Sequence, residues 1–115
     1  IHTDLYSVAF ENWRSEPVEL DVELAANGVQ VFRTAVGVEA NGRVALPCAW
    51  PRPALSYRLA VRPSWTDEWH TVRFRGEGTH CSVTKLRPDD AVSETVDFEY
   101  TTPCPSTGSE PDSCR

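Results

Sequence analysis

The strongest constraint on the fold is a strict alternation of apolar and acidic residues over residues 18–24, where the sequence reads VELDVEL. Successive side chains of a β-strand point to opposite faces, so this segment predicts a strand with one buried and one solvated face. Asn27-Gly28 follows, and this dipeptide is the strongest short signal of a β-hairpin. We therefore expect a return strand that begins at Val29 and ends near Val36.

Similar alternations recur along the chain, and no stretch of useful length has the period of a helix. Further strands are predicted at about residues 5–10, 44–46, 54–62, 69–75, 80–86 and 93–101, with turn-forming residues between them. The apolar residues expected to share one face of segment 54–62 are Leu55, Tyr57, Leu59 and Val61. Many short strands separated by turns indicate an all-β fold, and we predict an antiparallel two-sheet sandwich of about seven or eight strands.

The chain has four cysteines, Cys48, Cys81, Cys104 and Cys114, and no C-x-x-C pair. This even number indicates disulfides rather than a metal cluster. Cys81 opens one predicted strand and Cys104 follows the next, so an antiparallel hairpin would bring them together and favours a Cys81–Cys104 bond. Cys48–Cys114 then follows by elimination, and the alternative is Cys48–Cys81 with Cys104–Cys114.

Residues 1–103 are expected to form the sandwich, and residues 104–115 form a tail that is rich in Pro, Ser, Thr and Gly. This composition is typical of flexible segments, but the two cysteines predict that a disulfide ties the tail down. Disulfides persist outside the reducing cytosol, and the chain contains no methionine. We therefore expect a secreted or cell-surface protein whose signal peptide is cut before Ile1. No apolar run approaches the roughly 20 residues of a membrane helix, so no transmembrane segment is expected in the mature chain.

The formal net charge is −6, from 17 acids and 11 bases. This charge argues against binding to nucleic acids, which requires clustered Lys and Arg, and against binding to anionic membranes. Lys85 is the only lysine among the bases. The acid excess together with the lack of lysine favours a protein from a high-salt habitat, and codon bias in a GC-rich genome is the alternative.

No pattern in the sequence brings together a nucleophile, a general base and an orienting partner, so we do not expect an enzyme. His80-Cys81 on a sandwich would fit a blue-copper site only if Cys81 were a free thiolate with a second histidine nearby in the same loop. His2 could hold Cu(II) together with the terminal amine, but any chain with a histidine at this position could do so. We therefore expect no metal or other cofactor, and a small copper protein is the third choice after the two functions below.

The four tryptophans differ in their sequence contexts. Trp50 and Trp69 are the candidates for the core, because a buried tryptophan fills the sandwich of immunoglobulin domains. Trp13 and Trp65 lie in polar connections and are predicted at the surface, where indole rings stack on sugars or form protein interfaces. These two residues are therefore candidate ligand-binding residues.

Several motifs occur together in this chain. They are Asn12, Ser15-Glu16-Pro17-Val18, the alternating strand, Asn27-Gly28, Val31-Phe32, a second turn before Val44-Ala45-Leu46-Pro47, Tyr57-Arg58-Leu59, and a late strand with a cysteine that is followed by a second cysteine. In these motifs about two thirds of the chain resembles small secreted immunoglobulin-like sandwich proteins of halophilic archaea. The resemblance implies an immunoglobulin-like fold and an extracellular location but no site residues. The Pro-rich tail with its extra cysteine departs from the pattern.

Two functions fit these features. The first is a structural subunit of the cell surface that assembles with copies of itself, as a filament or pilus, by exchange of its N-terminal strand. The residues predicted to contact the neighbouring subunit are Asp4, Leu5, Tyr6, Val8 and Phe10, of which Tyr6, Val8 and Phe10 are expected to share one face. The alternative is a monomeric adhesion module, or a module that binds carbohydrate or protein, through Trp13 and Trp65.

Overall fold

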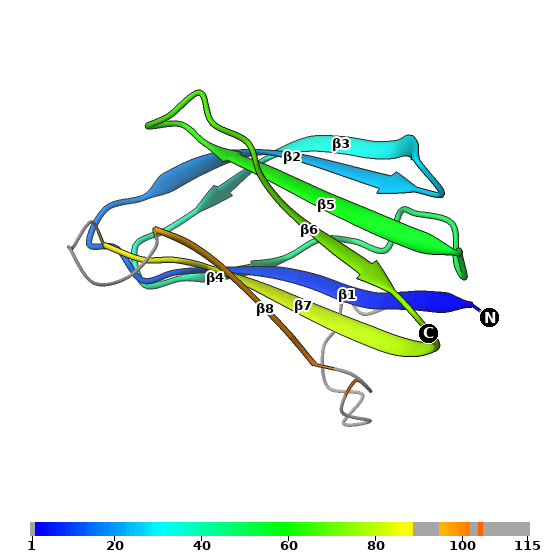
Figure 1. Cartoon of the computed structure of the whole chain (residues 1–115). Coiled ribbons are helices and arrows are strands. Elements are labelled where there is room, and N and C mark those ends of the chain that lie inside the picture. Colours follow the sequence, from blue (N-terminus) through cyan, green and yellow to red (C-terminus); the bar gives the residue numbers. More distant parts are fainter. Residues whose placement is uncertain (1, 89–94, 102–103, 105–115) are drawn as a thin grey trace.

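The computed structural model describes residues 2–88, 95–101 and 104 and contains eight strands in two stacked four-stranded sheets (Figure 1). The strands are β1 (Thr3–Asn12), β2 (Val18–Ala26), β3 (Val29–Val38), β4 (Arg43–Ala45), β5 (Ser56–Pro63), β6 (His70–Arg75), β7 (Gly78–Leu86) and β8 (Val96–Thr101). Sheet A has the order β4-β1-β7-β8, and sheet B has the order β3-β2-β5-β6. The predicted all-β, two-sheet architecture is confirmed. Within these residues no helix is long and apolar enough to cross a membrane.

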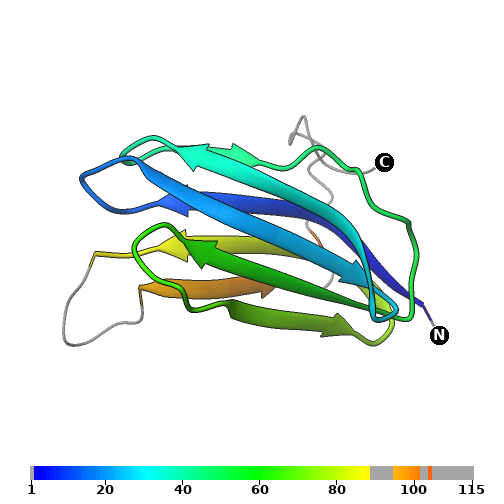
Figure 2. The same cartoon turned by 90° about the horizontal axis from the view of Figure 1, so that it is seen from above.

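The strand pairing departs from the purely antiparallel arrangement that we predicted. β1 and β7 are parallel neighbours in sheet A, from Thr3 beside Gly78 to Asn12 beside Leu86, whereas the other strand pairs are antiparallel. Parallel strands need a long connection. After β1 and before β7, the chain forms β4 at the edge of sheet A and all four strands of sheet B (Figure 2). Apolar alternation indicates which face of a strand is buried but not the direction of its neighbour, so the pattern could not predict the parallel pairing of β1 with β7.

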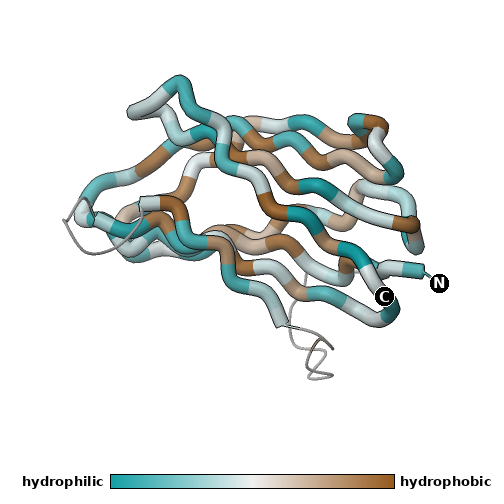
Figure 3. The backbone as a smooth tube through the Cα atoms, in the orientation of Figure 1, coloured by the Kyte–Doolittle hydropathy of each residue, from teal (hydrophilic) through white to brown (hydrophobic). Residues whose placement is uncertain are grey.

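The alternating segment and its turn fold as predicted. The four apolar residues of β2 at positions 18, 20, 22 and 24 are buried and lie opposite β3, and the last three of them also lie opposite β5 on the other edge. Asn27 and Gly28 both have positive φ angles, of 54° and 81°, which is what a tight two-residue hairpin turn requires. Brown and teal positions alternate along these strands in Figure 3, as expected for sheets with one buried face.

The prediction for the first strand is correct for Val8 and Phe10, which share the buried face, and wrong for Tyr6. The pairing of β1 with β7 shifts register between Leu5 and Ser7, so Leu5, Val8 and Phe10 are fully buried together. Tyr6 does not share that face and is only half-buried, with the Arg52 guanidinium 5.7 Å from its ring centre. The β-bulge arises in a segment with apolar residues at almost every position, where simple alternation cannot fix the inward set.

β1 is held on both edges by its own chain. β7 pairs along one edge, and β4 pairs with Ala9–Glu11 on the other. Beyond β4, the Leu46 N–H donates to the Val8 carbonyl at 2.9 Å, and Thr3 exchanges two backbone hydrogen bonds with Ala54. Asp4 accepts two hydrogen bonds from the Arg52 guanidinium, at 2.6 and 2.7 Å. The residues predicted for exchange between subunits therefore complete their own sandwich in this structure.

The Pro-rich corner between β4 and β5 closes one end of the sandwich. Trp50 is 6% exposed, and its indole N–H donates to the Leu5 carbonyl at 2.9 Å. The Tyr57 hydroxyl donates to the Pro51 carbonyl at 2.7 Å, which ties β5 to the corner. Leu55 precedes β5 and is 66% exposed, so it does not join the buried face of that strand as predicted. Its placement follows from the turn, where its backbone N–H donates to the Asn27 side chain at 2.7 Å.

The predicted Cys81–Cys104 disulfide is confirmed and joins β7 to the segment after β8, with the Cα atoms 5.3 Å apart. This bond excludes the alternative pairing of Cys48 with Cys81. Cys48 is also disulfide-bonded, and its predicted partner Cys114 lies outside the described residues. The same is true of the tail from residue 105 onward.

The inner face of β7 is polar, which the sequence analysis missed. Its buried residues His80, Ser82 and Thr84 point into the sandwich, whereas Val83 lies on the outer side. The Ser82 and Thr84 hydroxyl oxygens form no hydrogen bond with any residue that the structure describes. Buried hydroxyls without partners cost stability, so this strand departs from an optimal core.

Candidate functional site

The two tryptophans predicted at the surface lie in the β1–β2 and β5–β6 loops, and both loops are at the end of the sandwich opposite the N-terminus (left in Figure 1). Trp13 is in the loop between β1 and β2 and is 49% exposed, and Trp65 is in the loop between β5 and β6 and is 38% exposed. Trp50 fills the core, as one or two tryptophans were expected to do, and Trp69 is half-buried. The structure thus separates the candidate ligand-binding residues from the tryptophan that stabilises the fold.

Asn12, the last residue of β1, fixes the loop that carries Trp13. It is almost fully buried, and its amide nitrogen lies within hydrogen-bonding distance of the carbonyls of Glu16 at 2.7 Å, Val38 at 3.2 Å and Glu39 at 3.1 Å. Its side-chain oxygen accepts a hydrogen bond from the Arg14 backbone N–H at 2.9 Å. Asn12 therefore ties the loop both to itself and to the end of β3.

Trp13 lies against the outer face of sheet A at its rim. The Lys85 ammonium and the Arg87 guanidinium are each 5.0 Å from the centre of its ring. Its backbone N–H donates to the Leu86 carbonyl at 2.8 Å, and its indole N–H donates to Glu11 at 3.1 Å. Cations over an exposed indole contribute about 0.5–1 kcal/mol each, so the ring is held in place while half of its surface stays in solvent.

The cations beside Trp13 belong to a charge ladder that crosses sheet A. In register across β4, β1, β7 and β8, Arg43 lies opposite Glu11, Glu11 beside Lys85, and Lys85 opposite Asp97. Among the described residues, four ion pairs connect the ladder and its neighbours: Arg43–Glu11 at 2.6 Å, Lys85–Glu99 at 2.7 Å, Arg87–Asp97 at 3.0 Å and Arg87–Glu99 at 3.5 Å. Opposite charges on neighbouring strands favour this register. Lys85, the single lysine of the chain, is thus part of the charge ladder and also contacts the Trp13 ring.

Glu11 joins the ladder to the tryptophan. Burial raises the pKa of its carboxyl group, but hydrogen bonds from Trp13 and Arg43 and the positive charges of Arg43 and Lys85 together outweigh burial. The pKa of Glu11 is therefore held below its ordinary value. Protonation of this group would remove its negative charge and weaken the hydrogen bond that it accepts from the Trp13 indole N–H.

We expect the Glu11–Trp13 hydrogen bond to weaken only in acid. A carboxylate whose pKa is lower in the folded state stabilises the fold above its unfolded pKa of about 4.3, and that contribution is lost as the pH falls through the folded pKa. The carboxyl carbon signal of Glu11 and the indole N–H signal of Trp13 should titrate together in NMR spectra, with a midpoint below about 4.3. Glu11→Gln should abolish the indole titration, and a midpoint above the ordinary value would contradict the assignment.

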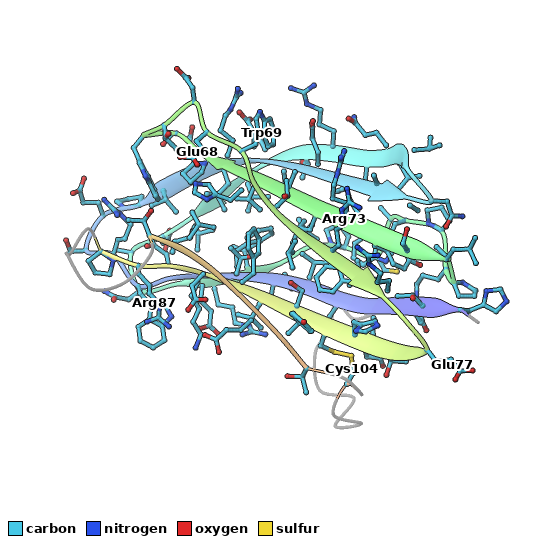
Figure 4. All side chains as sticks on the ribbon, in the orientation of Figure 1. Glu68, Trp69, Arg73, Glu77, Arg87 and Cys104 are labelled. Atoms are coloured by element: carbon cyan, nitrogen blue, oxygen red, sulfur yellow. A yellow bond between two sulfur atoms is a disulfide. The ribbon has the colours of Figure 1, made fainter. Side chains whose placement is uncertain are left out.

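Arg14 connects the two exposed tryptophans across the sandwich. Its guanidinium carbon lies 4.3 Å from the centre of the Trp65 ring, and it donates a hydrogen bond to the Arg87 carbonyl at 3.0 Å. Arg14 therefore links the loop of sheet B to the end of β7. On the sheet B side, Arg62 lies 4.9 Å from the centre of the Trp69 ring and pairs with Asp21 at 2.6 Å. Figure 4 labels Arg87 and Trp69, which mark the two sides of this end.

A pocket of about 240 Å³ opens beside Trp13. Its lining residues are Trp13, Arg14, Ser15, Glu16, Asn41 and Pro88. They combine one aromatic ring with hydroxyl, carboxylate, amide and guanidinium groups, which is a set that can donate and accept hydrogen bonds around a small polar ligand. Trp65 does not line this pocket and presents a second aromatic surface beyond Arg14.

The structure bears on the copper hypotheses in one respect. Cys81 is in a disulfide, so it cannot supply the thiolate that a blue-copper site needs, and that hypothesis is wrong. Within the described ranges, no group of three or more His, Cys, Asp or Glu side chains is arranged to hold a metal ion. His80 is buried on the inner face of β7, and His2 is exposed before β1.

Comparison of the chain with protein-family models, with curated proteins and with solved structures finds no match. Sequence reasoning found Trp13 and Trp65 but missed Asn12 and Arg14, which position them. One signal for Asn12 was available, because it lies two residues after the buried Phe10, where a polar side chain must find buried partners.

Proposed function

We propose that this protein is an extracellular module that binds carbohydrate through the end of the sandwich that carries Trp13 and Trp65. The observation that carries the proposal is that Trp13 is half exposed although its backbone, its indole N–H and one side of its ring are all held by neighbours. An aromatic ring that is both solvent-exposed and already fixed in position loses little conformational entropy when a ligand binds to it.

The pocket beside Trp13 supports a saccharide as the ligand. Sugars combine apolar C–H faces, which stack on indole rings, with hydroxyl groups, which need both donors and acceptors. Asn41, Glu16 and Arg14 supply such groups around the ring. A volume of about 240 Å³ is below the range of about 300–1,000 Å³ typical of enclosing ligand pockets, so the site suits one unit of a longer chain.

The extracellular location is part of the same proposal. It is supported by the Cys81–Cys104 disulfide and by the disulfide of Cys48, since such bonds persist in oxidising compartments. An immunoglobulin-like class is supported by the two stacked four-stranded sheets, while the parallel pairing of β1 with β7 sets this sandwich apart from a purely antiparallel one. The role that we propose is binding rather than catalysis.

Assembly by exchange of the N-terminal strand remains a prediction without a supporting contact. Exchange would require β1 to leave β7 and β4 and to withdraw Leu5, Val8 and Phe10 from the core. It would also break the two hydrogen bonds between Asp4 and Arg52. The mass of the protein in solution tests it, because a monomer at all concentrations would contradict strand exchange.

The binding proposal is tested with a panel of immobilised glycans and three single variants. Trp13→Ala should weaken binding to the glycans that the wild-type protein selects by tenfold or more, because truncation of a central aromatic residue costs about 2 kcal/mol or more. Trp65→Ala should weaken it less, because this residue lies outside the pocket. Tyr100→Ala is the matched control, since Tyr100 is also an exposed aromatic residue but lies on the edge strand β8. Equal binding by Trp13→Ala and wild type would contradict the proposal.

A further inference from the structure

Three arginines gather on the outer face of sheet B, at β5 and β6. Arg58 lies directly opposite Arg73 in the pairing of the two strands, and Arg75 lies opposite Ser56. Their neighbours Tyr57 and Phe74 point into the core, so the three guanidinium groups project to solvent, where all three residues are exposed. Arg58, Arg73 and Arg75 line one pocket of about 230 Å³, and Figure 4 labels Arg73 in this region.

The ion pairs between described residues do not include these three arginines. Among the residues that the structure describes, no carboxylate lies within ion-pairing distance of Arg58, Arg73 or Arg75. Like charges directly opposite each other on neighbouring strands destabilise a sheet. The arrangement is unusual for a chain with 17 acids and a net charge of −6, and it leaves a local positive field.

Arg62 of the same strand differs from Arg58 in having an acidic partner. It lies on the same face of β5, four residues after Arg58, and faces Asp21 of β2, with which it pairs at 2.6 Å. The residue of β2 opposite Arg58 is Ala25. A small side chain therefore stands where an acid would complete the pair, and it also leaves room for the pocket.

The other lining residues keep this pocket open. They are Ala25, Gly28, Leu55, Ser56 and Tyr57. A Cβ atom added at Gly28 would meet nothing within 4 Å, so the turn stands clear of its neighbours. Apart from the buried Tyr57, these lining residues are small or at least partly exposed, and three guanidinium groups border the rest of the pocket.

We infer that Arg58, Arg73 and Arg75 form a binding site for a tetrahedral oxyanion, phosphate or sulfate, either free or as an ester on a small molecule. Guanidinium groups present planar forks of N–H donors that match the oxygens of such groups, and they are the preferred residues for this recognition. Two or three guanidiniums on one dianion would also neutralise the repulsion between Arg58 and Arg73. This site is on a different surface from the Trp13 pocket, and the inference does not rest on the proposed function.

The test compares the thermal unfolding of three proteins: the wild type, Arg73→Gln and Arg62→Gln. Each is measured in chloride, in inorganic sulfate, in inorganic phosphate and in a monosaccharide sulfate ester, at one constant ionic strength. Sulfate or phosphate should raise the midpoint of the wild type above its value in chloride, with saturation, because a ligand that binds only the folded state stabilises it. Arg62→Gln should retain this increase and Arg73→Gln should lose it. A larger increase with the ester than with free sulfate would place the oxyanion on a carrier molecule, and an equal one would show that the free ion suffices.

Arg73→Gln removes like charge and keeps a polar side chain on an exposed position, so it should fold at least as stably as the wild type in chloride. Equal responses of Arg62→Gln and Arg73→Gln, or no difference between chloride and the two oxyanions, would overturn the inference. Trp13→Ala should keep the full response, so a failure of carbohydrate binding and a failure of oxyanion binding can be told apart.

Discussion

Trp50→Ala is expected to lower the free energy of unfolding by about 3–5 kcal/mol, the range found when a buried aromatic residue is truncated. Trp50 is almost fully buried beneath the Pro-rich corner, and its ring lies edge-on to Phe32 with 6.4 Å between the centroids. Its indole N–H donates to the Leu5 carbonyl. Leu5 lies outside the part of β1 that pairs with β4, which covers only Ala9–Glu11. The substitution would therefore leave both a cavity and an unpaired carbonyl.

Urea unfolding of the disulfide-intact protein measures this effect, with two controls. Trp50→Phe should cost clearly less than Trp50→Ala, because it retains most of the ring and loses mainly the hydrogen bond to Leu5. Trp65→Ala should cost less than about 1 kcal/mol, because Trp65 lies in an exposed loop. If Trp65→Ala destabilised the protein as much as Trp50→Ala, the division between core and surface tryptophans would be wrong.

Asn12→Ala is expected to cost about 2–4 kcal/mol, because each lost hydrogen bond contributes about 1 kcal/mol and buried carbonyls left without donors add to the loss. The carbonyls concerned belong to Glu16, Val38 and Glu39. The same substitution should release the loop that carries Trp13, so ligand binding should weaken even under conditions where the variant is folded. Urea unfolding and the glycan panel measure these two effects separately.

The matched control for Asn12 is Asn41→Gly. Asn41 is exposed in the turn before β4 and has a φ angle of 58°, a conformation that glycine adopts freely. Its stability should change by less than about 1 kcal/mol. If Asn12→Ala lowered the free energy of unfolding no more than Asn41→Gly does, the buried amide of Asn12 would not organise the loop.

The sequence predicted best where a strand has one apolar and one charged face. The segment 18–24 folded as expected because any other phase would bury its acids. The first strand has apolar residues on both faces, so its phase depended on a bulge at Leu5–Ser7 that pairing with β7 creates. The sequence analysis also did not predict which residues of β7 face the core. This strand buries the polar residues His80, Ser82 and Thr84, whereas an alternating pattern predicts apolar residues on the buried face.

The candidate site was predictable only in part. Trp13 and Trp65 could be assigned to the surface from their polar surroundings, and that assignment is confirmed. Their position at one end depends on the strand order, which brings together loops more than 50 residues apart. The charge ladder through Glu11 and Lys85 likewise depends on the parallel register of β1 and β7, for which the sequence offers no local signal.

The most direct test of the central claim follows the indole N–H signals of the four tryptophans in ¹H–¹⁵N spectra while a glycan selected on the panel is added. A ligand in the proposed pocket should shift the Trp13 signal most, move the Trp65 signal less and leave the buried Trp50 signal unchanged. Trp13→Ala should remove the remaining shifts at equal ligand concentration. No shift at Trp13, or equal shifts at all four indoles, would contradict carbohydrate binding at this end of the sandwich.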